Sequence, residues 1–92
     1  MGVVADRITS KLTRAFAPVV FDLVDESHRH AGHAGHDHQG ESHFALTLSS
    51  AAFAGKGRVE RQRMVYAVLS DELNGRVHAL RMVLKTPEKD HS

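Results

Sequence analysis

Apolar residues recur at helical and strand spacings along this chain, and the pattern predicts where its elements lie. Residues 6–16 carry apolar side chains at a helical spacing, with Asp6 available as N-cap and Pro18 preventing continuation. Residues 19–25 are rich in β-branched and aromatic side chains, with Val19 and two further apolar residues on one face. The pattern therefore predicts a first helix followed directly by a first strand.

A polar segment separates this strand from the next one. Residues 26–41 contain several glycines and no large apolar side chain, so they are predicted to form a loop. Residues 43–48 then alternate, with Phe44, Leu46 and Leu48 facing one way. This alternation predicts a second strand that forms a hairpin with the first.

The next stretch is predicted to be helical. Ser49 and Ser50 are placed to cap a short turn through Phe53. Residues 58–73 repeat apolar side chains at a helical spacing, and Gly75 supplies the C-terminal stop. The apolar stripe of this long helix comprises Val65, Val68, Leu69 and Leu73.

The last regular element is a third strand. Residues 78–84 alternate again, and the polar residues 87–92 are expected to fray. The crossover that leads to this strand is long enough for it to return parallel to an earlier strand. The element order predicts one α/β (α+β) domain over residues 1–92, with a three-stranded mixed sheet and its helices packed on one face.

Composition narrows the chemistry. The chain has no cysteine, which excludes disulfides, thiol redox chemistry and any cluster held solely by its own thiolates. Of its eight histidines, six lie between His28 and His43. A metal site here therefore depends on histidine or carboxylate, and the formal charge of +1 provides no broad field for phosphates.

Membrane association and catalysis receive no support from the sequence. No apolar run approaches the roughly 18 residues that cross a bilayer, and the first residues lack the order of a secretory signal. We expect a cytoplasmic location, or an organellar one in a eukaryote. Asp25 and Glu26 are adjacent carboxylates without an evident nucleophile, so we expect no enzymatic activity.

Three stretches together resemble the BolA family. They are DESHRHAGH at 25–33 running into GESHF at 40–44, FAGKGRVERQRMVYAVLSDEL at 53–73, and VHAL at 77–80. Their order and separations match the family, which makes the resemblance more specific than any one motif within it. The resemblance covers nearly the whole chain after the first helix.

The resemblance implies a class II KH fold, αββααβ, and a partnership with monothiol glutaredoxins. The glutaredoxin's cysteine and bound glutathione would supply thiolates for a shared 2Fe–2S cluster. The family's ligand in the HAL motif corresponds to His78, and its loop ligand falls within DESHRHAGH, where His30 is the preferred position and His33 its nearest rival. An imidazole ligand is protonatable near neutral pH, which suits cluster transfer or sensing.

Two departures from related patterns limit the resemblance. Many members carry a histidine where this chain has Gln62, so this position is not treated as a ligand. The GxxG loop with which KH domains clamp nucleic acid is not evident, because Gly55 and Gly57 have the wrong spacing. By alternation His43 lies opposite the Phe44 face, which predicts a surface residue.

Other functions stay open. The basic residues Lys56, Arg58, Arg61 and Arg63 gather around the start of the long helix, as a solvated face or as a surface for glutaredoxin, glutathione or DNA. A DNA-binding transcriptional regulator of the BolA type is the alternative function. The histidine-rich loop could also carry zinc or nickel, and a homodimer is open for the isolated chain.

Overall fold

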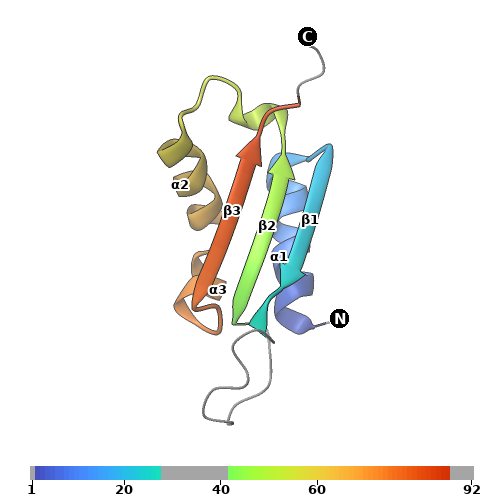
Figure 1. Cartoon of the computed structure of the whole chain (residues 1–92), viewed down its shortest axis with the longest axis vertical. Coiled ribbons are helices and arrows are strands. Elements are labelled where there is room, and N and C mark those ends of the chain that lie inside the picture. The colour runs from blue at the N-terminus through green and yellow to red at the C-terminus, as the bar shows by residue number, and fades with distance from the viewer. Residues whose placement is uncertain (1, 28–41, 88–92) are drawn as a thin grey trace.

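The computed structural model describes residues 2–27 and 42–87 of the chain. Its elements in chain order are α1 (Val3–Phe16), β1 (Val20–Asp25), β2 (His43–Ser49), the short 3-10 helix η2 (Ala51–Phe53), α2 (Arg58–Val68), α3 (Ser70–Asn74) and β3 (Ala79–Lys85). This order confirms the predicted order of helices and strands, except that two helices stand where one long helix was predicted. Figure 1 shows the three strands side by side, with α1 behind the sheet and α2 and α3 next to β3.

The three strands form one mixed sheet with β2 at its centre. Strand β1 pairs antiparallel with β2, and β3 pairs parallel with it, starting from His43 opposite Ala79. A parallel pair requires a long crossover, and the helical segment between β2 and β3 provides it. The hairpin, the parallel return and the mixed sheet are therefore confirmed.

The core lies between the sheet and the helices. Helix α1 places an apolar residue against the core about once per turn, and β2 contributes every second residue. The rings of Phe16 and Phe53 meet with centroids 5.0 Å apart and join the end of α1 to η2. The buried hydrophobic residues are Val4, Ile8, Leu12, Phe16, Phe44, Leu46, Leu48, Phe53, Val65, Leu69 and Val77.

Ser50 joins three elements at one end of the sheet. Its hydroxyl donates to the Phe16 carbonyl at 2.6 Å and accepts from the Ala52 N–H at 3.0 Å. Its own N–H donates to the Lys85 carbonyl at 2.9 Å. The prediction that Ser50 caps the turn through Phe53 is confirmed, and the serine is fully buried.

Some predicted boundaries were wrong. Helix α1 begins at Val3, and Asp6 is in its first turn because the Asp6 N–H already donates to the Gly2 carbonyl at 3.0 Å. Val19 precedes β1 and is 66% exposed, so it does not belong to the core face. The spacing of apolar residues could not place the start of this helix, because a helix begins where its backbone hydrogen bonds begin.

The long helix predicted over residues 58–73 is divided in two. Leu69 leaves helical geometry, with φ −102° and ψ 20°, and separates α2 from α3. Leu69 is buried at the break and Glu72 is buried after it, where its carboxylate accepts a hydrogen bond from Lys11 of α1. The Glu72–Lys11 pair therefore ties α3 to α1.

Candidate functional site

His78 is exposed at the start of β3, in the VHAL stretch. Its predecessor Val77 is buried, and the Val77 N–H donates to the Glu72 carbonyl at 3.1 Å. The His78 N–H donates to the Ser42 carbonyl at 2.7 Å, and Ala79 donates to the same oxygen at 3.1 Å. The backbone is therefore fixed on both sides of an outward-facing imidazole.

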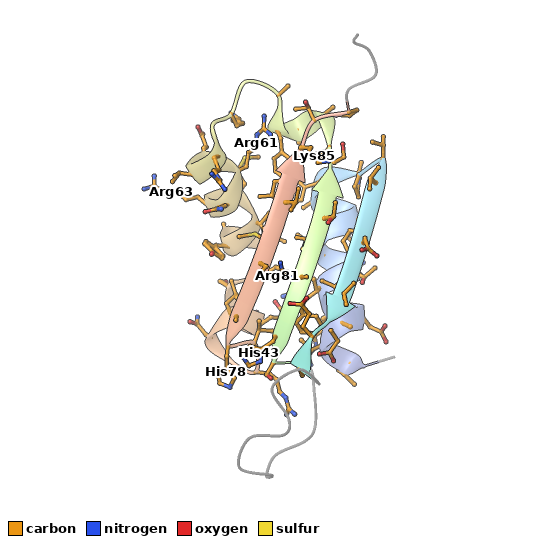
Figure 2. All side chains as sticks on the ribbon, viewed as in Figure 1. His43, Arg61, Arg63, His78, Arg81 and Lys85 are labelled. Atoms are coloured by element: carbon orange, nitrogen blue, oxygen red, sulfur yellow. The ribbon has the colours of Figure 1, made fainter. Side chains whose placement is uncertain are left out.

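His43 lies next to His78, at the start of the neighbouring strand (Figure 2). The two ring centroids are 6.3 Å apart, and the His43 Nδ1 is 2.9 Å from the Ser42 hydroxyl. His43 is half-buried, whereas the sequence predicted only a surface residue. The parallel register, with His43 opposite Ala79, is the signal that places it beside His78.

Ser27 and Ser42 lie at this same end of the sheet, where the Ser27 hydroxyl links the two strands. The buried Ser27 hydroxyl accepts from the Ser42 N–H at 2.9 Å and the His43 N–H at 3.2 Å. The Ser27 N–H donates to the Asp25 carboxylate at 2.9 Å, and the Glu26 N–H to the His43 carbonyl at 2.7 Å. Residues 25–27 and 42–43 therefore form a hydrogen-bonded base.

Glu26 also links the end of β1 to β3. Arg81 donates from Nε to Glu26 Oε1 at 3.1 Å and from a second nitrogen to Oε2. The hydrogen bond and the negative charge of Glu26 raise the pKa of the Arg81 guanidinium above its ordinary value. Glu26 therefore has a structural partner in β3.

The predicted loop ligands His30 and His33 lie outside the described residues, as do most of loop 26–41 and the tail beyond residue 87. Within residues 2–27 and 42–87, no three histidine, cysteine or acidic side chains come close enough to hold a metal ion. The described part of this site thus offers the imidazoles of His78 and His43. An imidazole is a competent iron ligand, so His78 fits a site completed by other donors.

The predicted basic surface lies at the opposite end of the sheet from His78 (Figure 2). Arg58 and Arg63 are exposed on α2. The Lys56 ammonium nitrogen is 4.0 Å from a carboxylate oxygen of Glu60. Arg61 is half-buried instead, and its structural contacts distinguish it from the others.

Arg61 holds three elements together. Its Nε donates to the Lys56 carbonyl at 2.9 Å, and its terminal nitrogen donates to the Leu84 carbonyl at 3.0 Å. Its guanidinium carbon is 5.9 Å from the centre of the Phe53 ring. Arg61 is therefore a brace between η2, α2 and β3.

Comparison with known proteins decides the family. The BolA-like protein family model matches residues 12–89. This chain belongs to the BolA family. It is 46% identical to the DNA-binding transcriptional regulator BolA of Escherichia coli, over 84% of this chain and 70% of the relative. It is 39% identical to human BolA-like protein 1, over 95% of this chain and 61% of the relative.

Solved structures agree with this assignment. The BolA domain of SufE1 from Arabidopsis thaliana superimposes with a TM-score of 0.85 at 44% identity, covering 95% of each chain. BolA1 from Mus musculus gives a TM-score of 0.80 at 40% identity, covering 95% of this chain and 68% of the other. The full SufE-like protein 1 of Arabidopsis is longer, and this chain spans 23% of it.

The names of the relatives also indicate what kind of proteins they are and in which compartment some of them are located. The BolA relatives are named as a regulator or as BolA-like proteins, and those names denote no enzyme. Two Arabidopsis relatives are named chloroplastic or chloroplastic/mitochondrial. None of the helices in residues 2–27 and 42–87 has the length and apolar character to pass through a bilayer.

Proposed function

We propose that this BolA-family chain is a non-catalytic adaptor that binds a monothiol glutaredoxin and shares a 2Fe–2S cluster with it. In this role it acts in iron–sulfur cluster trafficking or in iron and redox regulation. One observation carries the proposal: an outward-facing His78 is anchored beside both ends of the histidine-rich segment. We place the protein in the cytoplasm, or in an organelle if its source is eukaryotic.

The donor groups of this chain favour a cluster that it shares with a partner over a cluster that it holds alone. The chain contains no cysteine, so thiolates must come from the glutaredoxin and glutathione. His78 supplies a neutral nitrogen donor, and its fixed backbone limits the entropy lost when the imidazole binds. When bound, the cluster supplies the redox and transfer chemistry, while this chain orients one or two imidazoles.

Chain length favours His30 over His33 as the second ligand. His30 follows the anchored Ser27 by three residues, so their Cα atoms lie within roughly 11 Å of each other. For His33 the Cα atom can lie up to roughly 22 Å from that of Ser27, so the position of His33 relative to this end of the sheet is less restricted. His43 is already 6.3 Å from His78 between ring centroids and is the third candidate to test.

Anaerobic reconstitution tests the adaptor. A monothiol glutaredoxin, glutathione, iron and sulfide are mixed with the wild type, His78→Ala, His30→Ala, His33→Ala or His43→Ala, and visible circular dichroism is followed. We expect a new heterodimer spectrum that His78→Ala abolishes and His30→Ala alters. An unchanged spectrum of the glutaredoxin's own cluster on adding the wild type would refute the adaptor.

DNA-binding transcriptional regulation is the second candidate. It is supported by the name of the Escherichia coli relative and by the exposed Arg58 and Arg63 on α2. DNA affinity should then fall steeply with salt, and each of Arg58→Ala and Arg63→Ala should reduce the salt slope by about 1. His78→Ala should leave DNA binding unchanged, which separates this role from the adaptor.

A further inference from the structure

Strand β3 forms one edge of the sheet, and alternate residues turn their backbone groups away from β2. The Ala79 N–H donates to Ser42, and the Lys85 carbonyl accepts from Ser50, so the odd-numbered residues of β3 pair with β2. The N–H and C=O groups of Leu80, Met82 and Leu84 therefore face outward.

Arg61 engages one of these outward groups, the Leu84 carbonyl. In the part of the chain that the structure describes, no hydrogen bond engages the outward backbone groups of Leu80 and Met82. An unpaired strand edge is a template for another extended chain.

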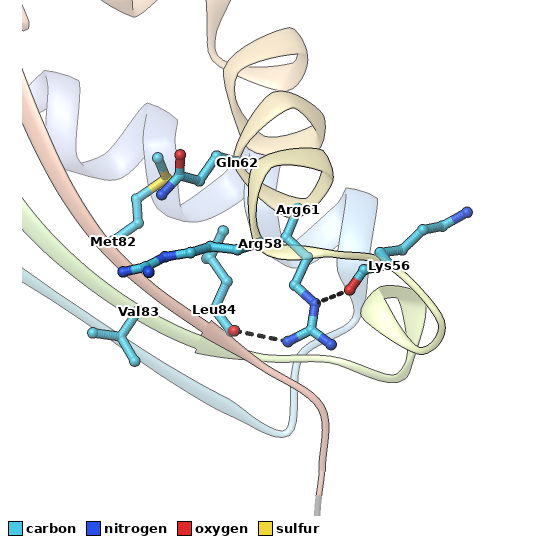
Figure 3. A pocket seen from close by; sticks show the side chains of 7 residues that line it. All are labelled: Lys56, Arg58, Arg61, Gln62, Met82, Val83 and Leu84. Atoms are coloured by element: carbon cyan, nitrogen blue, oxygen red, sulfur yellow. Dashed lines mark hydrogen bonds between the residues drawn. The ribbon is translucent and has the colours of Figure 1, made fainter.

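A groove follows this edge between β3 and α2 (Figure 3). Arg58 and Gln62 extend from α2 toward Met82, and this hollow has a volume of about 450 Å³. A second hollow, also about 450 Å³, continues past Tyr66 and Leu80 and shares Gln62 and Met82 with the first. The two hollows run along the outward-facing residues of β3.

The groove is positively charged. Lys56, Arg58 and Arg61 line its first part, and no carboxylate side chain of the described residues lines either part. Lys56 lies 4.0 Å from Glu60 and Arg81, in the second part, is paired with Glu26, so Arg58 and Arg61 carry most of the charge. Met82 and Leu84 give it an apolar floor. An occupant with alternating acidic and apolar side chains matches both features.

We propose that this groove binds an extended acidic segment of a partner protein, which adds to β3 as a fourth strand. Its backbone pairs with Leu80 and Met82, and its carboxylates meet Arg58 and Lys56. A nucleic-acid backbone matches the edge less well, because phosphodiesters accept hydrogen bonds and donate none, which leaves the Leu80 and Met82 carbonyls unpaired. The charged part of this surface, around Arg61, lies at the far end of the sheet from His78, and the proposal goes beyond the shared cluster site.

Titration with designed peptides tests the proposal on the full chain. The probe is a capped hexapeptide that alternates glutamate and valine, followed by amide chemical shifts in nitrogen-15 NMR spectra. We expect saturable shifts centred on Leu80, Met82 and Leu84. The same peptide with methylated backbone nitrogens should bind at least about tenfold more weakly, because it keeps its charge and loses its donors.

Two arginines of α2 form a matched pair of variants. Arg58→Glu removes a cation that lines the groove and should weaken peptide binding about tenfold, while Arg63→Glu, exposed on the same helix and outside the groove, should change it less than about twofold. Equal binding of the methylated peptide would overturn strand addition. This comparison uses only the wild-type chain, so it does not depend on whether a variant folds. Absence of binding, or a preference for a short DNA duplex that both variants weaken equally, would overturn the acidic-segment partner.

Discussion

At the scale of single residues, Ser27 links the end of β1 to the start of β2 and so stabilises the hydrogen-bonded base at this end of the sheet. Its buried hydroxyl accepts the N–H groups of Ser42 and His43. In Ser27→Ala both donors lose their acceptor, so we expect the free energy of unfolding to fall by about 1–2 kcal/mol. Urea denaturation followed by far-UV circular dichroism measures the loss.

Ser10→Ala is the matched control for this substitution. Ser10 is exposed on α1, and serine and alanine differ there mainly in helix propensity. We expect a change within about 0.5 kcal/mol. An equal loss in both variants would mean that Ser27 gives the base no special support.

The sequence singled out His78 as a candidate ligand but did not place His43 beside it, for a reason that belongs to this scale. Alternation assigns a residue to a face of a strand, but it does not say which residue of another strand lies beside it. His43 meets His78 only because β2 and β3 are parallel and paired with His43 opposite Ala79. The VHAL resemblance indicated His78, and nothing local indicated the pair.

At the scale of elements, the pair Lys11 and Glu72 ties α3 to α1. The Glu72 side chain is 2% exposed and its carboxylate is 2.9 Å from the Lys11 ammonium. In Glu72→Gln the shape is kept but the lysine loses its charged partner, so we expect the unfolding free energy to fall by about 1–3 kcal/mol. Guanidinium denaturation of the purified chain measures it.

The neighbouring Asp71 provides the control. Its carboxylate is 3.8 Å from the same lysine, but its side chain is 89% exposed. Solvent screens such a pair, so Asp71→Asn should cost no more than about 0.5 kcal/mol. A loss in Asp71→Asn that equals the loss in Glu72→Gln would show that burial of the pair does not matter.

This tie also explains why the sequence predicted one long helix where the structure has two. The stripe of Val65, Val68, Leu69 and Leu73 keeps a helical period through the break at Leu69. The partner of Glu72 lies 61 positions earlier in the chain, and no local pattern reveals it. Element types were therefore predicted, while the break depended on a distant contact.

At the scale of the whole molecule, strand direction explains the separation of the two candidate surfaces. Strands β2 and β3 are parallel, so His43, the first residue of β2, and His78, just before β3, lie at one end. The crossover leaves from the other end of β2, so Arg61 and the start of α2 lie there. The predicted parallel return implied this arrangement, although the likeness to the class II KH fold and the ligand roles stay predictions.

Arg61 supports the whole molecule rather than one element, because it joins η2, α2 and β3. In Arg61→Ala the Lys56 and Leu84 carbonyls lose their donor and Phe53 loses the cation near its ring, so we expect a loss of about 1–3 kcal/mol. Thermal unfolding of Arg61→Ala and of the control Arg63→Ala, whose side chain is exposed, measures it. If Arg61→Ala weakened DNA binding while its stability matched that of Arg63→Ala, the brace would be disproved and Arg61 would join the nucleic-acid surface.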